Sequence, residues 1–310
     1  MSNLLVIGSD EHKELLCRVF IDTHDPFQPE AIQWPELDAE TLQRLKAMPV
    51  WNEATRTEAA TAVKVQSLGD TEKDPLLAKA ISLQGYEEGR HAAVLQLLAR
   101  HYGIHVDDHP DPEVPSNPTR AFLRTGYGEC MDSFFAFGLF RMGERAQYFP
   151  PALVAIFETI MQEEARHILF IVNWAAYLRA RRPWVARPAF DAWRAWNIVA
   201  QAIGRLRGAL EMAGGGKGDK GKPKAETPEA APPAVDNSTA GFTMGAASIF
   251  GDFSIRTFLE LCLAENDRRL APYDARLLRP TMVPSVIRQV VKVLPRRPPS
   301  APASSRERAA

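Results

Sequence analysis

The chain has 310 residues, of which 45% are hydrophobic, and a formal net charge of −1. This length allows one large domain or two small ones with a real core. The near-zero charge gives no reason to expect nucleic acid or a membrane surface as a partner. The three cysteines form no CxxC pair, which is typical of a reducing compartment. With no signal-peptide pattern and no apolar run long enough to span a bilayer, the sequence predicts a cytoplasmic protein.

Residues 1–47 are predicted to form an irregular lead-in, because proline and turn-forming residues recur between residues 22 and 38. One short helix is expected inside it. Asp38 is a suitable N-cap for that helix, and residues 39–47 form its body.

Four long helices are predicted next, with glycine and proline marking their ends. They are expected to run from about Val50 to Leu68 with a stop at Gly69, from Pro75 behind the Asp74 cap to about His101, from Asn117-Pro118 to about Gln147, and from Pro150-Pro151 to about Arg181. Two short connections and one longer crossover between the second and third helices match a known four-helix-bundle topology.

The remaining third of the chain is predicted to be helical apart from two flexible segments. A fifth helix is expected over residues 189–212, so that residues 48–212 form the four-helix bundle together with this fifth helix. Residues 213–240 have almost no large apolar side chain and are predicted to be a disordered linker. Residues 241–295 are predicted to be C-terminal helices that pack on the bundle, and 296–310 a flexible tail. No strand-type alternation of useful length occurs, so the predicted class is all-α.

A nearly identical charged pentapeptide occurs twice, as EEGRH at residues 87–91 and EEARH at residues 163–167. Each copy lies inside a predicted apolar helix and contains a Glu-x-x-His pair, Glu88 with His91 and Glu164 with His167. Residues three apart lie on one face of a helix. A carboxylate and an imidazole on one face provide half a site for a divalent transition metal, and two such halves indicate a dinuclear site.

A dinuclear site needs one further carboxylate from each of the other two helices. On the first helix, Glu58 lies on the inward-facing stripe of apolar residues, whereas Glu53 shares its face with polar residues. On the third helix, Glu129 lies on the inward stripe, and Asp132 one turn later is its rival. We therefore predict Glu58 and Glu129 as ligands, with Glu53 and Asp132 as the alternatives.

Charge supports this interpretation, because four buried carboxylates without partners would be very costly to desolvate. Two divalent cations balance four carboxylates when both histidines are neutral. The ligand set Glu58, Glu88, His91, Glu129, Glu164 and His167 resembles that of the ferritin-like di-iron carboxylate superfamily, and more narrowly a bacterial group of ferritin-like domain proteins. The resemblance covers residues 48–181 and implies a four-helix bundle with two Fe ions, or one Mn and one Fe.

The resemblance implies a di-iron oxygenase or oxidase that uses O2 on an unidentified small molecule. The alternative is a ferroxidase or iron-handling protein without an organic substrate. Because the sequence contains no electron-transfer motif, a separate reductase is expected if turnover needs electrons. The other charged residues of the pentapeptides, Glu87, Arg90, Glu163 and Arg166, are interpreted as solvent-side partners, with support of the ligands as the alternative role.

Overall fold

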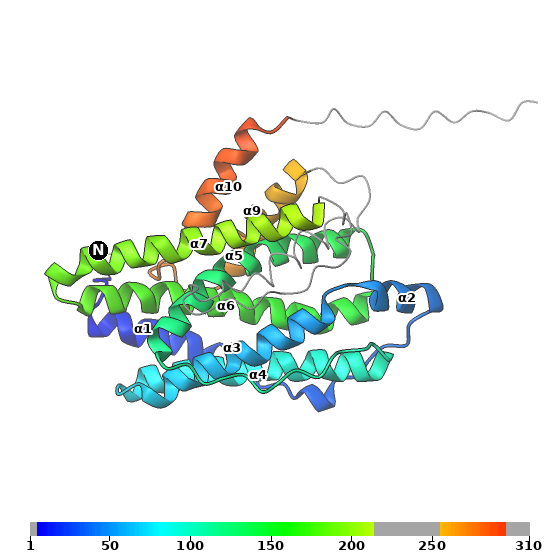
Figure 1. Cartoon of the computed structure of the whole chain (residues 1–310), viewed down its shortest axis with the longest axis horizontal. Helices are drawn as coiled ribbons and strands as arrows, with labels where there is room; N and C mark the ends of the chain where they lie inside the picture. The colour runs from blue at the N-terminus through cyan, green and yellow to red at the C-terminus, as the bar shows by residue number, and fades with distance from the viewer. Residues whose placement is uncertain (1–4, 214–254, 296–310) are drawn as a thin grey trace, which may run out of the picture.

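The computed structural model describes residues 5–213 and 255–295, and within these ranges every regular element is helical. The all-α prediction is therefore confirmed for the described part of the chain. Four long helices lie side by side (Figure 1), and they are α3 (Trp51–Thr71), α4 (Pro75–Tyr102), α5 (Pro118–Arg145) and α6 (Pro151–Arg181). The predicted fifth helix is α7 (Arg187–Ala213), preceded by a 3₁₀ turn, η2 (Trp184–Ala186).

Helix α7 includes Ala213, so the first residue assigned to the predicted linker is helical. The rest of that linker, residues 214–240, lies outside the described residues, as do 241–254 and the tail 296–310.

The helix ends follow the capping signals of the sequence. Asp38, Asp74 and Asn117 each accept a backbone N–H from the first turn of the helix that they precede. Gly103 ends α4 with a φ of 61°, a left-handed conformation in which glycine is favoured. The short helix α2 (Ala39–Ala47) begins directly after its predicted cap, so these boundaries are confirmed.

The predicted stop at Gly69 is wrong, because α3 continues through it to Thr71. Gly69 is buried where α3 meets α4, and a Cβ there would lie 2.3 Å from Oγ of Ser82. Glycine is needed at this position for the close approach of two helices, rather than to end one of them.

The prediction of an irregular lead-in with one helix is also wrong. Helix α1 (Asp10–Asp22) precedes the short 3₁₀ turn η1 (Pro29–Ala31). Ser9 caps α1 by accepting from the backbone N of His12 at 3.1 Å. The buried side chains Leu16, Cys17 and Phe20 join the main core cluster with residues of α3, α4, α5 and α6. This burial gives α1 a stability that its short sequence pattern does not indicate.

The C-terminal helices α9 (Ile255–Leu270) and α10 (Met282–Val293) pack against α5 through a separate apolar cluster. Cys262 of α9 lies so close to α5 that a Cβ on Gly138 would be 2.3 Å from its Sγ. A third cluster joins α2 to α3, α4 and α6 at one end of the long helices.

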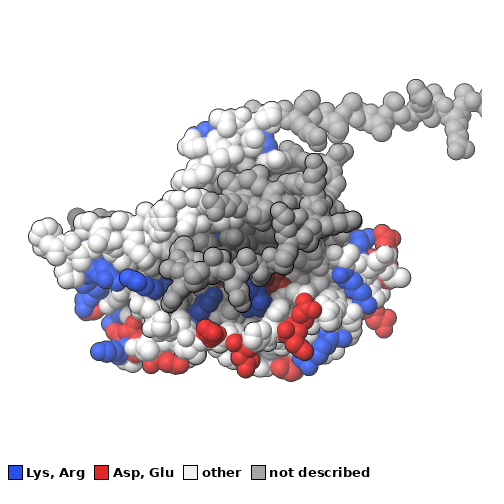
Figure 2. Space-filling view, viewed as in Figure 1, with Lys and Arg blue, Asp and Glu red and all other residues white. Residues whose placement is uncertain are grey.

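On the face shown in Figure 2, acidic and basic side chains are interspersed over the lower half of the molecule. Among the described helices, none combines the length and apolar character that a bilayer span requires.

Candidate metal centre

The two pentapeptides face each other from the middle of α4 and α6. Their Glu-x-x-His pairs are buried, with exposed fractions of 2% for Glu88, 1% for His91, 9% for Glu164 and 0% for His167. On each helix the glutamate and the histidine are one turn apart, so both side chains of a pair project into the same interior space. The predicted half-sites are thus brought together.

The imidazole Nδ1 atoms point at carboxylates of the opposite or adjacent helices. Nδ1 of His91 lies 3.3 Å from Glu164 Oε1 and 3.5 Å from Glu58 Oε2. Nδ1 of His167 lies 3.0 Å from Glu88 Oε1. One ligand atom from each of Glu58, Glu88, His91 and Glu164 lies within 4.8 Å of the others, so this group could hold a metal ion.

Glu129 of α5 belongs to the same region. Both of its carboxylate oxygens are buried and have no hydrogen-bond partner. Burial first, and then the nearby charges of Glu88 and Glu164, raise the pKa of Glu129 well above its ordinary value. A buried carboxyl group with two unpaired oxygens is costly unless a cation or proton satisfies it.

The rival carboxylates have other partners. Asp132 Oδ1 accepts from Nε of Arg205 on α7 at 2.7 Å. Glu53 Oε1 accepts from Nη2 of Arg56 at 2.7 Å and from Thr57 Oγ1 at 2.9 Å. The structure thus gathers the six predicted residues around one space and pairs the two rivals with arginines.

The electrostatics show how much negative charge the centre concentrates. Burial is the main reason why the pKa of Glu58 is raised to about 8, with Glu88 and Glu164 adding to the effect. Burial alone would lower the pKa of His91 and His167, but the surrounding carboxylates outweigh it and raise both well above the ordinary value. Without metal, Glu58, His91 and His167 therefore hold protons more tightly than usual, and divalent cations would displace these protons on binding.

The donor set fits a metal. Nδ1 of His91 and of His167 and both oxygens of Glu129 are buried without hydrogen-bond partners, although each lies among potential ligand atoms. Imidazole nitrogen and carboxylate oxygen are the ligands that divalent iron and manganese accept. Unsatisfied buried atoms of these types are explained if they are ligands.

The first glutamate of each pentapeptide supports the histidine of the other helix. Glu163 Oε2 lies 2.9 Å from Nε2 of His91, and Glu87 Oε2 lies 2.8 Å from Nε2 of His167. Burial opposes ionisation of Glu87, but the hydrogen bond and charge of His167, with Arg166 and His24, lower its pKa to about 2. A carboxylate that accepts from Nε2–H leaves the Nδ1 lone pair directed at the metal space.

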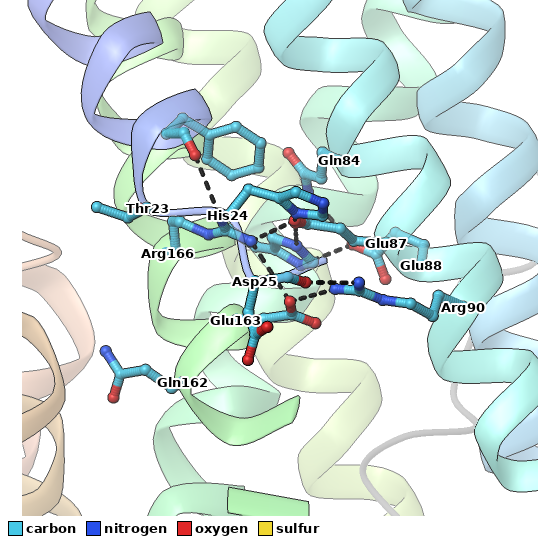
Figure 3. A network of polar contacts seen from close by, with 12 residues as sticks. Thr23, His24, Asp25, Gln84, Glu87, Glu88, Arg90, Gln162, Glu163 and Arg166 are labelled. Atoms are coloured by element: carbon cyan, nitrogen blue, oxygen red, sulfur yellow. Dashed lines mark hydrogen bonds and ion pairs between the residues drawn. The ribbon is translucent and has the colours of Figure 1, made fainter. Parts of the chain in front are cut away.

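The pentapeptide arginines complete the same arrangement. Arg166 of α6 pairs with Glu87 of α4, and Arg90 of α4 pairs with Glu163 of α6 (Figure 3). Each arginine also donates to a backbone carbonyl of α1 or of the turn after it, which covers the side of the centre opposite the ligand carboxylates. Nη1 of Arg166 reaches the carbonyl oxygen of Phe20 at 3.1 Å, and Nη1 of Arg90 that of Asp25 at 2.6 Å.

The interpretation of these four residues as solvent-side partners is wrong. Glu87, Arg90, Glu163 and Arg166 are 0%, 3%, 4% and 2% exposed, respectively. They lie away from the ligand face of their helices, and α1 with the turn after it covers them. The signal in the sequence is that the repeat includes the first glutamate and the arginine as well as the Glu-x-x-His pair.

His24, in the turn after α1, also contacts Glu87. With Glu163 it forms a second group of potential ligand atoms within 4.8 Å. Glu87 and Glu163 are already engaged by arginine and histidine, so this group supports the first one rather than forming a separate metal site.

A cavity of about 930 Å³ opens on the carboxylate side of the centre. Its wall includes Glu58, Glu88, His91, Glu129 and Glu164, but not His167. The opposite side is closed by α1, where the ring of Phe20 packs 5.9 Å from that of His167. The site is therefore accessible from one side only among the described residues.

The chain matches no family model, no curated protein and no solved structure.

Proposed function

We propose that this protein is a ferritin-like di-iron carboxylate oxidoreductase that uses O2 to oxidise a small organic molecule. The observation that supports it most is the reciprocal arrangement of the two EExRH segments. In each segment the second glutamate and the histidine are candidate ligands. The first glutamate orients the histidine of the opposite helix, and the arginine pairs with the first glutamate of the opposite helix. A surface charge repeat would not produce this buried, cross-helix pairing.

The helix arrangement supports the same proposal. The four long helices carry one candidate ligand glutamate each on α3 and α5, Glu58 and Glu129, and a Glu-x-x-His pair each on α4 and α6. This is the ligand distribution of ferritin-like di-iron and di-manganese bundles. Four carboxylates and two neutral imidazoles balance two divalent ions, either two Fe or one Mn and one Fe.

Glu58, Glu88, His91, Glu129, Glu164 and His167 would hold two iron ions, which when ferrous would supply electrons for the reduction of O2. The chain positions the reaction: Glu87 and Glu163 fix the histidine tautomers, and α1 keeps water from the histidine side. O2 and substrate would approach from the cavity on the carboxylate side. Electrons that restore the ferrous state would come from a separate reductase, as the sequence predicts.

The alternative is iron handling without an organic substrate. An ion pathway is expected to be lined by carboxylates and water. Here the wall of the cavity beyond the candidate ligands is mostly apolar, with Trp51, Leu95, Leu153 and Phe157 among its residues. Apolar walls with a few placed polar groups are typical of organic-ligand sites, so this observation favours the oxygenase or oxidase.

Elemental analysis after anaerobic loading with Fe(II) tests the proposal. We expect about two Fe per chain, and loss of most of this iron in the Glu164→Ala/His167→Ala double variant. The matched control is Glu260→Ala/His105→Ala, which removes the same side-chain types from the exterior. Circular dichroism checks that each variant is folded. Iron content that is near zero in the wild type, or unchanged in the first variant, would overturn the proposal.

A further inference from the structure

The cavity beside the metal centre has an apolar part. Its apolar residues come from α2, the start of α3, the end of α4 and the start of α6, all at one end of the long helices. They include Leu45, Met48, Val50, Trp51, Leu95, Phe149, Leu153 and Phe157. Several of them form the third core cluster. A volume of about 930 Å³ is near the upper end of the range for small-molecule sites.

The cations in the wall fall into two kinds. Arg56 and Arg205 are paired with Glu53 and Asp132. The side chains of Lys64 and Arg124 have no hydrogen bond or ion pair within the described ranges, although both line the cavity and are half-buried. A half-buried cation without a partner is favourable only if water or an anionic ligand compensates it.

The two unpaired cations lie at the same level of the cavity. Figure 1 shows α3 leaving the α2 end of the molecule and α5 returning toward it, so these helices are antiparallel. Lys64 follows Glu58 along α3, and Arg124 precedes Glu129 along α5. On both helices, the direction from the candidate ligand to the cation therefore leads away from the α2 end. The cavity therefore has an apolar end, the candidate ligands in its middle, and two cations beyond them.

We infer that the substrate of this centre is an amphipathic organic anion, whose acidic head binds between Lys64 and Arg124 and whose apolar body passes the metal centre into the apolar end. This inference rests on the proposed function for the reaction that the anion would undergo. Binding of the anion does not depend on that function, because Lys64, Arg124 and the apolar wall lie outside the set of candidate ligands. With the ligand carboxylates balanced by metal, the unpaired charges on this part of the wall are positive, which favours an anion over a neutral or cationic molecule of the same length.

Isothermal titration calorimetry of the full chain tests the inference, with decanoate as the probe and with decanol and decyltrimethylammonium as matched probes. We expect decanoate to bind at one site per chain, and the neutral and cationic probes about tenfold or more weakly, because a charge-assisted contact is lost. Lys64→Ala and Arg124→Ala should each weaken decanoate about tenfold while leaving decanol unchanged. The controls Lys79→Ala and Arg100→Ala remove exposed cations of α4 that do not line the cavity.

The position of the apolar body is tested with Ala136→Phe, which adds a ring to the wall on α5. This variant should bind decanoate more weakly than hexanoate relative to the wild type, because it shortens the space available to the chain. Equal affinity for all three ten-carbon probes, or equal effects of the cavity and control variants, would overturn the inference.

Failure of the inference is distinguishable from failure of the proposed function. The titrations are made on metal-free and on iron-loaded protein, and the iron content is measured separately. Iron binding without selective decanoate binding would refute the substrate class and leave the di-iron proposal standing. Selective decanoate binding to a chain that holds no iron would refute the di-iron proposal and retain the anion site.

Discussion

Nε2 of His167 on α6 lies 2.8 Å from Oε2 of Glu87 on α4, and both side chains are fully buried. Glu87 is held in turn by Arg166, which comes one residue before this histidine. The contact therefore closes a ring that joins two helices across the candidate metal centre. The pair His91 and Glu163 repeats it with the roles of the helices exchanged.

Removal of Arg166 should be strongly destabilising. Arg166→Met leaves the Glu87 carboxylate buried without its arginine partner, so we expect the free energy of unfolding to fall by about 3–5 kcal/mol. Urea denaturation of metal-free protein measures it. Arg18→Met on α1 is the control, because Arg18 pairs with Glu14 at the surface and should contribute less than about 1 kcal/mol.

A double variant shows whether charge is the cause. Glu87→Gln/Arg166→Met removes both members of the pair, so it should be more stable than the sum of the single changes predicts. Additive losses would mean that packing, rather than the uncompensated charge, accounts for the effect.

Local signals account for the parts of the fold that the sequence predicts well. A cap such as Asp74 followed by Pro75 acts within one turn, and the structure begins α4 at that proline. Gly69 shows where local reasoning fails, because its role depends on Ser82 across the helix pair. Helix α1 is a related case, since its stability comes from burial against α4 and α6 rather than from its own sequence.

The same distinction applies to the candidate site. The spacing of Glu88 and His91 predicts that they share a face, because that depends only on helix geometry. The role of Glu163 depends on which residue of α4 lies opposite, and this is a matter of register between helices far apart in sequence. The inward stripe favours Glu129 over Asp132, but that Asp132 has another partner depends on the position of Arg205 on α7.

Carboxylate-to-amide variants should separate the predicted ligands from their rivals. Glu129→Gln is expected to reduce bound iron from about two per chain to about one or less, because an amide is a much weaker ligand for a divalent ion. Asp132→Asn should keep the iron, since its partner is Arg205. Glu58→Gln and Glu53→Gln provide the same comparison on α3. Iron loss that follows Asp132 or Glu53 instead would reassign the ligand set.

The metal-free protein should become less stable as the pH rises from about 6.5 to 8. The pKa of Glu58 is raised from 4.5 to about 8 in the folded state, so folding favours the protonated acid. The contribution of Glu58 to the free energy of unfolding is full below pH 4.5 and is lost as the pH approaches 8. His91 and His167 act with the same sign, because their pKa values are also raised.

One buried histidine acts with the opposite sign. Burial lowers the pKa of His12 below 6.5, so its effect on stability is mostly complete at that pH, and only about 0.4 kcal/mol of gain remains above it. We expect a loss of about 2 kcal/mol from Glu58 alone across the window, seen as a falling Tm in the presence of a chelator. Glu58→Gln should reduce the slope, and saturating divalent metal should reverse it, since metal displaces the protons. A Tm that rises with pH in the chelated wild type would contradict this.

Two glycine variants should change stability in opposite directions. Gly138→Ala places a methyl group 2.3 Å from Cys262 Sγ, where α9 meets α5, so we expect destabilisation of about 1–3 kcal/mol from overpacking. Gly89→Ala meets only Ala62, at 3.8 Å, and should stabilise α4 by up to about 1 kcal/mol through helix propensity. Urea unfolding of both variants measures the difference. Similar values for the two would mean that α9 is not held against α5 as closely as the structure shows, and that its role as part of the fold should be reconsidered.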